Sequence, residues 1–470
     1  MKMHINGKWV DKDEKIEVKN PFNGEVIDTV PAGTPEDVKK AIDAAVEGYE
    51  INRKLPVHKR VDILLKAAEL MRGRHEELSR TIATEGSKTI REARGEVTRA
   101  INTITLSGEE AKRILGETIP FDSMPGAENR VGYYYRFPIG VIAAITPFND
   151  PLNLVAHKLG PIIAGGNSVV LKPATVTPLS ALKLGEILLD AGLPPKILNI
   201  VTGYGHVIGD ALVTDERVRM VTFTGGPEAG KEIIKKAGLK KIGMELGSNS
   251  PVIVMDDCDL EKAVESCVSG AFCAVGQNCI GVQRLYVQKN IYDKFEEKFV
   301  ERTKKMKVGF QLDEDTDMGP MITEHEAIRV EEWIKEAVQA GGQLLTGGGR
   351  KGSVVQPTVM KDVPKNCRLG HEEVFGPVVI LYKIDNLDEA IKEANDVVYG
   401  LHAGIFTNDI KTAFKAIKEI NVGGIMINDS SDYRIDGMPF GGVKNSGLGR
   451  EGIKFSLQEM TEPKVVCFNL

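Results

Sequence analysis

Apolar side chains recur at helical spacing through the first quarter of the chain. The segment Thr34-Pro35-Glu36-Asp37 supplies an N-cap, a proline at the first helical position and an acid at the third. It therefore predicts a helix from 35 to about 49. Apolar positions three and four residues apart predict a long helix over 58–84, and a further helix is predicted over 87–115. The apolar residues of the 58–84 pattern are Val61, Leu64, Leu65, Ala68, Leu70 and Met71.

The helical spacing stops at residue 116. The segment 116–138 contains Pro120, Pro125 and Gly126, and then the aromatic run Tyr133-Tyr134-Tyr135-Arg136-Phe137. Proline and glycine interrupt helices, whereas a run of aromatic residues favours a strand. Because predicted helices flank the segment, we expect 116–138 to form an extended hairpin that leaves the body of its domain.

From residue 139 onward, apolar strands alternate with helices. This alternation is typical of the α/β class, in which helices cover both faces of a parallel sheet. A second alternating block runs from about 251 to 428, so we expect one α/β domain before Glu245 and another after it. Ligands of such sheets bind beyond the carboxyl ends of the strands. The predicted strands are 140–145, 168–171, 197–201 and 218–223, and the predicted helices between them are 154–163 and 178–191.

Composition narrows the class of protein. The chain has 470 residues, of which 42% are hydrophobic and 27% charged, which suits a globular protein of two or three domains. The net charge of −6 without a basic run argues against a nucleic acid partner. The N-terminus has no apolar signal core, and no run of about 18 apolar residues could span a membrane. The six cysteines form no CxxC pair, so we expect reduced thiols in a cytoplasmic protein, and the scattered eight histidines do not indicate a metal site.

One thiol and one carboxylate are the most informative pair in the chain. Cys279 follows Gly276-Gln277-Asn278, and Glu245 lies in Met244-Glu245-Leu246-Gly247. A thiol in an apolar, glycine-containing stretch suits attack on a carbonyl carbon, and a partly desolvated carboxylate suits activation of water. The pair suggests covalent catalysis through a thioester that is finally hydrolysed. Taken singly, cysteine is more often an inert buried residue, and glutamate more often lies on the surface.

Two glycine-rich turns are candidates for binding a nucleotide. The segment 203–209 reads GxGxxxG after a predicted strand, which is close to a dinucleotide-binding turn. The segment 225–231 reads GxxxxGK and resembles a P-loop, the signature of an ATPase or kinase. Glu232 stands where a P-loop needs Ser or Thr, and Pro227 removes an N–H that would hold phosphate. The helix that begins after Gly225 remains a candidate anion site through its free N–H groups.

Seven segments in order resemble the aldehyde dehydrogenase superfamily over essentially the whole chain. The nearest branch contains the non-phosphorylating glyceraldehyde-3-phosphate and lactaldehyde dehydrogenases. The resemblance implies a Rossmann-like cofactor domain over 1–115 and 139–246, an α/β catalytic domain over 247–448, and a small β oligomerisation arm with a tail strand over 116–138 and 449–470. The segments are Ile145-Thr146-Pro147-Phe148-Asn149, Leu171-Lys172-Pro173-Ala174, Phe223-Thr224-Gly225, Met244-Glu245-Leu246-Gly247, Gly276-Gln277-Asn278-Cys279, Glu373-Val374-Phe375-Gly376-Pro377 and Pro439-Phe440-Gly441-Gly442.

The resemblance also implies a role for each matching residue. Cys279 would be the nucleophile, Asn149 would donate to the oxyanion together with the Cys279 N–H, and Glu245 would activate the deacylating water. Lys172 would bind the adenosine ribose and Glu373 the nicotinamide ribose. The residues implied to bind NAD or NADP are Ile145, Thr146, Pro147, Lys172, Thr175, Gly205, Phe223, Thr224, Gly225, Gly226, Leu246, Glu373 and Phe375.

Departures from the family pattern bear on cofactor and substrate. Thr175 stands where NAD-preferring relatives often carry Glu, which suggests that NADP is accepted because no carboxylate there repels a 2′-phosphate. Asn278 replaces an Arg that precedes the nucleophile in members acting on glyceraldehyde 3-phosphate. Arg434 lies in the loop that resembles their substrate pocket. The substrate is therefore expected to be a small aldehyde, either neutral and 2-hydroxylated or carrying an anionic tail.

We expect a homodimer or homotetramer that assembles through the arm. Three alternatives to the proposed enzyme class stay open at this point. The first is a P-loop-like ATPase or kinase that uses 225–231. The second is a coenzyme A-acylating aldehyde dehydrogenase, although such relatives often lack the acid found at Glu245. The third is a structural member of the family that binds cofactor without turnover, against which the intact Asn149, Glu245 and Cys279 argue.

Overall fold

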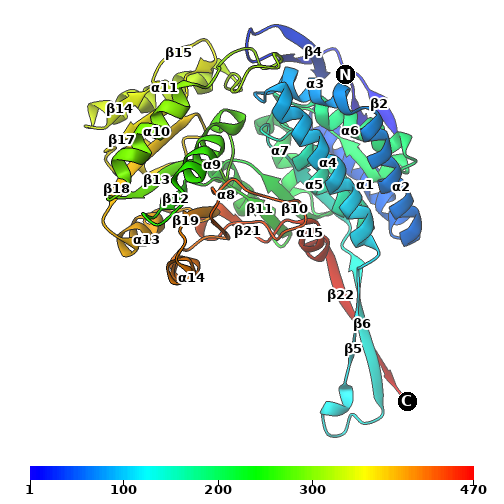
Figure 1. The fold of residues 1–470 in the computed structure, drawn as a ribbon. Helices are drawn as coiled ribbons and strands as arrows, with labels where there is room; N and C mark the ends of the chain where they lie inside the picture. The colour runs from blue at the N-terminus through cyan, green and yellow to red at the C-terminus, as the bar shows by residue number, and fades with distance from the viewer.

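The computed structural model describes residues 1–470 and contains two α/β units side by side, with a β arm that projects from the body (Figure 1). The first unit has an eight-stranded sheet in the order β2-β1-β9-β8-β7-β10-β11-β21. Its parallel centre consists of β9 (Leu198–Ile200), β8 (Ser168–Lys172), β7 (Val141–Ile145), β10 (Val218–Thr224) and β11 (Lys241–Glu245). The edges are β1 (Met3–Ile5), β2 (Lys8–Val10) and the late β21 (Gly447–Leu448).

The centre of the sheet forms around β7, which is wholly apolar, and β8, whose middle residues are Val169, Val170 and Leu171. Every residue of β7 and β8 is buried. Helix α5 (Asn153–Ala164) lies beneath them with all of its residues buried, and α6 (Leu179–Asp190), α7 (Gly205–Thr214) and α8 (Pro227–Ala237) connect the following strands. Continuous apolar runs of this kind are what a doubly covered parallel sheet requires.

The second unit is built around a seven-stranded sheet in the order β14-β17-β18-β13-β12-β19-β20. All neighbours in it run parallel except β14 (Gln343–Thr346). The other strands are β17 (Thr358–Lys361), β18 (Val378–Ile384), β13 (Val282–Gln288), β12 (Ser250–Val254), β19 (His402–Phe406) and β20 (Gly424–Ile427). The helices are α9 (Leu260–Phe272), α10 (Tyr292–Lys304), α11 (Glu324–Gln339), α12 (Arg368–His371), α13 (Leu387–Asn395) and α14 (Ile410–Glu419).

The N-terminal helices confirm one local prediction and correct another. Helix α1 (Pro35–Asn52) begins with the predicted capping box, in which the Thr34 hydroxyl accepts from the Asp37 N–H. The expected single helix over 58–84 is wrong. The chain forms α2 (Val57–Gly73) and α3 (His75–Glu85), separated by Arg74 in a non-helical conformation. Gly73 weakens the helix at this point, and the break lets the buried Leu78 and Ile82 of α3 join the same core.

The helix expected over 87–115 is shorter, since α4 (Ile90–Ala111) starts only after its cap at Thr89. The expected hairpin is present: β5 (Glu117–Ile119) and β6 (Arg130–Pro138) pair antiparallel around a 3-10 turn. The tail contributes α15 (Ile453–Glu459) and then β22 (Thr461–Asn469), which pairs with β6 along its whole length. Short hairpins β3 (Lys15–Lys19) with β4 (Val26–Pro31) and β15 (Arg350–Lys351) with β16 (Val354–Val355) complete the fold, in which no helix is long and apolar enough to cross a bilayer.

Candidate active site

A cavity of about 600 Å³ opens at the carboxyl ends of the first sheet, and residues of the second unit also line it. Parallel register sets its floor, because Ile145 pairs with Lys172 on one side and with Phe223 on the other. On the next pair of strands Thr224 lies opposite Glu245. The strand order reverses direction at β7, with β8 on one side and β10 on the other, and such a switch point is where α/β sheets bind ligands.

Glycines in the cavity wall beside α8 let side chains pack directly against the backbone. A Cβ atom at Gly225 would lie 2.5 Å from the Phe223 ring, and one at Gly230 would lie 2.6 Å from the Leu246 side chain. Gly226 is the N-cap of α8 and offers no side-chain cap, so the free N–H groups that follow Pro227 in the first turn stay available. Apolar side chains next to an uncapped helix start suit a flat ring system joined to a pyrophosphate.

Lys172 is a buried cation at the cavity wall. Its ammonium group donates to the Pro173 carbonyl oxygen at 3.1 Å, and no carboxylate pairs with it. Burial lowers the pKa of Lys172 to about 8. A buried ammonium with one neutral partner fits a ligand that brings oxygen acceptors, such as ribose hydroxyls.

Glu373 and Phe375 enter the cavity from the loop before β18. One oxygen of Glu373 accepts the Ser248 N–H at 2.8 Å. The other oxygen lies so close to Gly247 that a Cβ atom there would be 2.2 Å from it. Burial raises the pKa of Glu373 to about 7. The Phe375 ring meets the Phe148 ring edge-on at a centroid distance of 5.8 Å.

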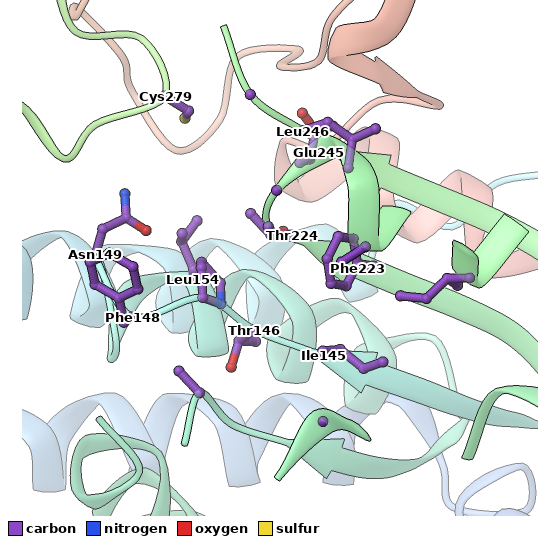
Figure 2. A pocket seen from close by; sticks show the side chains of 18 of the residues that line it. Ile145, Thr146, Phe148, Asn149, Leu154, Phe223, Thr224, Glu245, Leu246 and Cys279 are labelled. Carbon is purple, nitrogen blue, oxygen red and sulfur yellow. The ribbon is translucent and has the colours of Figure 1, made fainter. Parts of the chain in front are cut away.

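Cys279 lies in the loop between η3 (Cys273–Gly276) and β13, and its side chain is half-buried. Burial raises the pKa of the Cys279 thiol, the carboxylate of Glu373 raises it further, and Arg434 acts in the opposite direction. Figure 2 shows the Asn149 amide pointing across the cavity toward Cys279 from the loop that follows β7, with Glu245 farther along the cavity. The resting thiol is therefore protonated and faces an amide donor.

Two carboxylates in this region differ in proton affinity because their neighbours differ. Glu245 is 5% exposed and one of its oxygens has no hydrogen-bond partner; burial and then the nearby Glu451 raise its pKa well above the usual range. Burial would also raise the pKa of Glu451, but Lys158 at 3.1 Å and Arg434 at 3.4 Å lower it to about 2. Glu451 therefore carries the negative charge while Glu245 holds a proton, which is the arrangement expected of an acid–base group.

The cavity brings together most residues that the sequence singled out. Cys279, Asn149, Glu245 and Arg434 line it, as do all of the implied cofactor residues except Thr175. The Thr175 hydroxyl instead donates to the Gly203 carbonyl oxygen at 3.1 Å. Asn278 lines a separate cavity of about 10 Å³ near Glu373, not the main one.

The sequence did not predict two charged residues of this region. Glu451 carries no motif of its own, and Lys158 is a charged residue in a mostly apolar helix, an anomaly that could have drawn attention to it. The P-loop interpretation fails, because Lys231 lies on the surface, pairs with Glu228 at 2.8 Å and does not line the cavity. No group of three His, Cys, Asp or Glu side chains is placed to hold a metal ion.

Two linked α/β units around a dinucleotide-sized cavity with one thiol are the structure of a nicotinamide-dependent oxidoreductase. The chain belongs to the aldehyde dehydrogenase family, whose family model matches residues 9–466. It is accordingly an NAD(P)-dependent enzyme that oxidises aldehydes.

Similar proteins share this fold over their whole length. The 3-sulfolactaldehyde dehydrogenase of Priestia megaterium is 49% identical over 468 residues, covering 100% of this chain and 98% of the relative. The structure of aldehyde dehydrogenase 21 from Physcomitrella patens in complex with its product succinate has a TM-score of 0.97 at 44% identity and covers 100% of this chain and 98% of that one. Glyceraldehyde-3-phosphate dehydrogenase GapN from Methanocaldococcus jannaschii, complexed with NADP, has a TM-score of 0.94 at 41% identity, with coverage of 98% and 100%.

The electrostatics of the thiol can be tested without turnover. Replacing Glu373→Gln removes a negative charge that raises the pKa of Cys279, so alkylation of Cys279 by iodoacetamide at pH 8 is expected to accelerate. A fall of one pKa unit increases the thiolate fraction about tenfold when the pKa lies above the pH. Below the Glu373 pKa of about 7 the wild-type carboxyl is protonated, and the two proteins should converge.

Mass spectrometry of the alkylated peptides resolves the individual thiols, and the exposed Cys467 provides an internal control whose rate should not change. Arg434→Met should slow alkylation of Cys279, because Arg434 lowers its pKa. Equal rates at pH 8, or a difference that persists unchanged at pH 5.5, would contradict this account of the thiol.

Proposed function

We propose that the protein oxidises a small 2-hydroxy or anionic aldehyde to the free carboxylic acid, through a thioester on Cys279 that is hydrolysed with Glu245 as general base. The observation that carries this proposal is the buried carboxyl of Glu245. It lies in the same cavity as Cys279 and Asn149, keeps one oxygen without a partner and has a strongly raised proton affinity. A thioester that was passed to another acceptor would not need such a base.

The first chemical step is assigned to Cys279 and Asn149. The Cys279 thiol gives its proton to water, and the sulfur forms a bond to the aldehyde carbon while the carbonyl π electrons move to oxygen. The Asn149 amide and the Cys279 N–H donate hydrogen bonds to that oxyanion. One donor of this kind is worth roughly 3 kcal/mol in the transition state. When bound, the nicotinamide cofactor supplies the acceptor for the hydride that leaves the same carbon, and Cys279 is left as a thioester.

Glu245 is assigned to the second step. The Glu245 carboxyl first loses its own proton to solvent, and its carboxylate then takes a proton from water as the water oxygen attacks the thioester carbon. The carbon–sulfur bond breaks as the acid forms, and Glu245 returns the proton to the Cys279 sulfur. A base whose proton affinity has been raised toward the working pH is more effective than an ordinary carboxylate. The Glu451 charge supports this role, because it disfavours a second negative charge on Glu245.

Cofactor binding is assigned to the cavity residues beside α8 and Lys172, with a preference for NADP. Lys172 has no carboxylate partner, and Thr175 adds no negative charge near the expected position of the adenosine ribose. A 2′-phosphate would therefore meet a buried ammonium without repulsion. The NADP complex of the similar M. jannaschii enzyme supports this assignment.

For the substrate, Arg434 is the cationic group within the cavity at the end that holds Cys279. Its guanidinium lies over the Phe440 ring at 3.6 Å, and its Nε has no hydrogen-bond partner. Glu451, at 3.4 Å, is its carboxylate partner, so the guanidinium keeps N–H donors for an anionic tail. The names of the similar proteins, which mention 3-sulfolactaldehyde, succinate and glyceraldehyde 3-phosphate, support an aldehyde that carries an anion.

We expect a cytoplasmic enzyme, because all six cysteines are unpaired and a reducing compartment keeps the Cys279 thiol available.

The central test is a panel of neutral and anionic C3–C4 aldehydes, followed at the absorbance of the reduced nicotinamide with NAD and with NADP. The kcat/KM is expected to be higher with NADP. Glu245→Gln should give one equivalent of reduced cofactor per active site and then release acid about 100-fold more slowly, because only deacylation needs the base. Mass spectrometry should detect the acylated Cys279.

Cys279→Ala is the control and should give no burst. Coenzyme A should not accelerate the wild-type enzyme, and acceleration would identify it as an acylating dehydrogenase instead. The proposed mechanism would be wrong if Cys279→Ala oxidised aldehydes, or if Glu245→Gln released acid as fast as the wild-type enzyme.

Arg434→Ala tests whether Arg434 binds the anionic tail of the substrate. The KM for an anionic aldehyde is expected to rise about tenfold or more, the value of one charge-assisted hydrogen bond, while the KM for lactaldehyde changes little. Because Arg434 also lowers the pKa of Cys279 and Glu245, kcat should fall for both substrates. Equal changes in the two KM values would refute an anion-binding role.

Self-association through the arm is expected to give a homodimer or homotetramer. Strand β22 is the edge of its three-stranded sheet and exposes Val465 and Phe468, and β20 is an open edge of the seven-stranded sheet. Open apolar edges favour pairing with another chain. Sedimentation should give two or four times the chain mass of 51.3 kDa, and a change of Val465→Asp should shift it toward monomer. A wild-type protein that sediments as monomer would contradict this assembly.

A further inference from the structure

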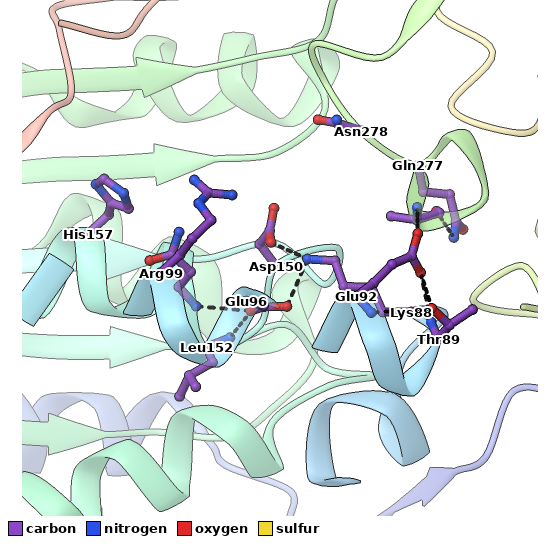
Figure 3. Close-up of polar contacts among 12 residues, drawn as sticks. Lys88, Thr89, Glu92, Glu96, Arg99, Asp150, Leu152, His157, Gln277 and Asn278 are labelled. Atoms are coloured by element: carbon purple, nitrogen blue, oxygen red, sulfur yellow. Dashed lines mark hydrogen bonds and ion pairs between the residues drawn. The ribbon is translucent and has the colours of Figure 1, made fainter. Parts of the chain in front are cut away.

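The first two turns of α4 contact both loops that carry the proposed oxyanion donors. Glu92 and Glu96 are four residues apart, so their side chains project from the same face of the helix. Figure 3 shows Glu96 reaching the segment that follows Asn149 and Glu92 reaching the turn that precedes Cys279. Neither carboxylate lines the main cavity, and the mechanism above uses neither.

Glu96 holds the segment that follows Asn149. One of its oxygens accepts the Leu152 N–H at 2.8 Å and the Asn153 N–H at 3.0 Å, at the start of α5. The other accepts from the Lys88 ammonium at 2.8 Å, and Lys88 also pairs with Asp150, the residue next to Asn149. Glu96 is 2% exposed, so these charge-assisted bonds are shielded from water.

Glu92 holds the turn that precedes Cys279. One oxygen accepts the Ala274 N–H at 2.8 Å, and the other accepts the N–H and hydroxyl of Thr89 at 2.8 and 3.1 Å. Ala274 and Val275 are both left-handed, with φ of 50° and 62°, which is unusual for residues with a Cβ and rare for a β-branched one. A conformation of this kind persists only where surrounding bonds impose it.

We propose that Glu92 and Glu96 are positioning residues that set the separation of Cys279 from Asn149, with Glu92 imposing the left-handed turn at Ala274 and Val275. The inference rests on the proposed function, because it assigns the two loops to one oxyanion site. A helix is stiff over a single turn, so two carboxylates on adjacent turns hold the two loops at a fixed spacing. Without Glu92 the turn relaxes and moves the Cys279 backbone N–H and sulfur together.

The experiment compares Glu92→Ala with Thr89→Ala, which removes the helix cap but leaves the bond from Ala274 to Glu92. A third variant, Glu92→Ala with Ala274→Gly, supplies a residue that adopts the left-handed conformation without a tether. Two quantities are measured: hydrogen exchange of the Ala274 amide, and steady-state kinetics with the best aldehyde of the panel. Binding of NADP is followed by the protein fluorescence.

In Glu92→Ala, exchange at Ala274 should accelerate about tenfold, since a protecting bond is lost. Its kcat should fall by about 100-fold, as expected for a displacement near 1 Å, while the KM and the Kd for NADP stay unchanged. Thr89→Ala should keep wild-type exchange at Ala274 and wild-type kcat, even if its melting temperature falls as much as that of Glu92→Ala. The double variant should recover most of the lost kcat.

Three results would overturn the proposal: a kcat in Thr89→Ala as low as in Glu92→Ala, unchanged exchange at Ala274 in Glu92→Ala, or no recovery of kcat in the double variant. A wild-type protein that oxidises no aldehyde would instead remove the proposed function. The exchange measurements would then still decide whether Glu92 imposes the turn, because they need no turnover.

Discussion

The parallel pairing of β7 with β8 and β10 is the interaction on which the site depends. It aligns Ile145 with Lys172 and Phe223, so that three strands end on one line at the floor of the cavity. Side chains alternate between the two faces of a sheet, and a slip of one residue would turn every one of these groups to the opposite face. The register is protected because both faces of β7 and β8 are buried, which makes any alternative pairing expose apolar surface.

Three charged side chains lie buried beside the floor of the cavity. Lys158, Glu451 and Arg434 form a buried chain in which opposite charges lie 3.1 and 3.4 Å apart. Removing water from such groups is costly, and a buried ion pair is often no more stabilising than apolar residues of the same size. What the chain of charges does achieve is a difference in proton affinity between Glu245 and Glu451, two carboxylates of the same chemical type. This difference is a property of the neighbours and not of the residues themselves.

The sequence predicts the elements well where one local signal dominates. Apolar runs located the central strands, and the capping box at Thr34 located the start of α1. The break at Arg74 was missed because helical spacing continues on both sides of it, and a single Gly73 does not by itself end a helix without the packing of α3. Motif residues of the site were found because they lie in recognisable segments. Lys158 and Glu451 were not, because they are 293 residues apart and the chain alone carries no sign that they meet. Asn278 and Thr175 were expected at the site from their motifs, but neither residue lines the main cavity.

The three-stranded arm has a consequence for the order of events during synthesis. Its central strand β6 is translated early, whereas its partner β22 follows much later; Arg136 and Thr461, which bond across the pair, are 325 residues apart. At roughly 5–20 residues per second, β6 waits on the order of tens of seconds with one edge unpaired. During that time β5 alone protects it, and neighbouring nascent chains on one messenger expose the same tyrosine-rich edge. Closing the arm is thus a late step, and protection of the β6 edge by a chaperone is most valuable before β22 emerges from the ribosome.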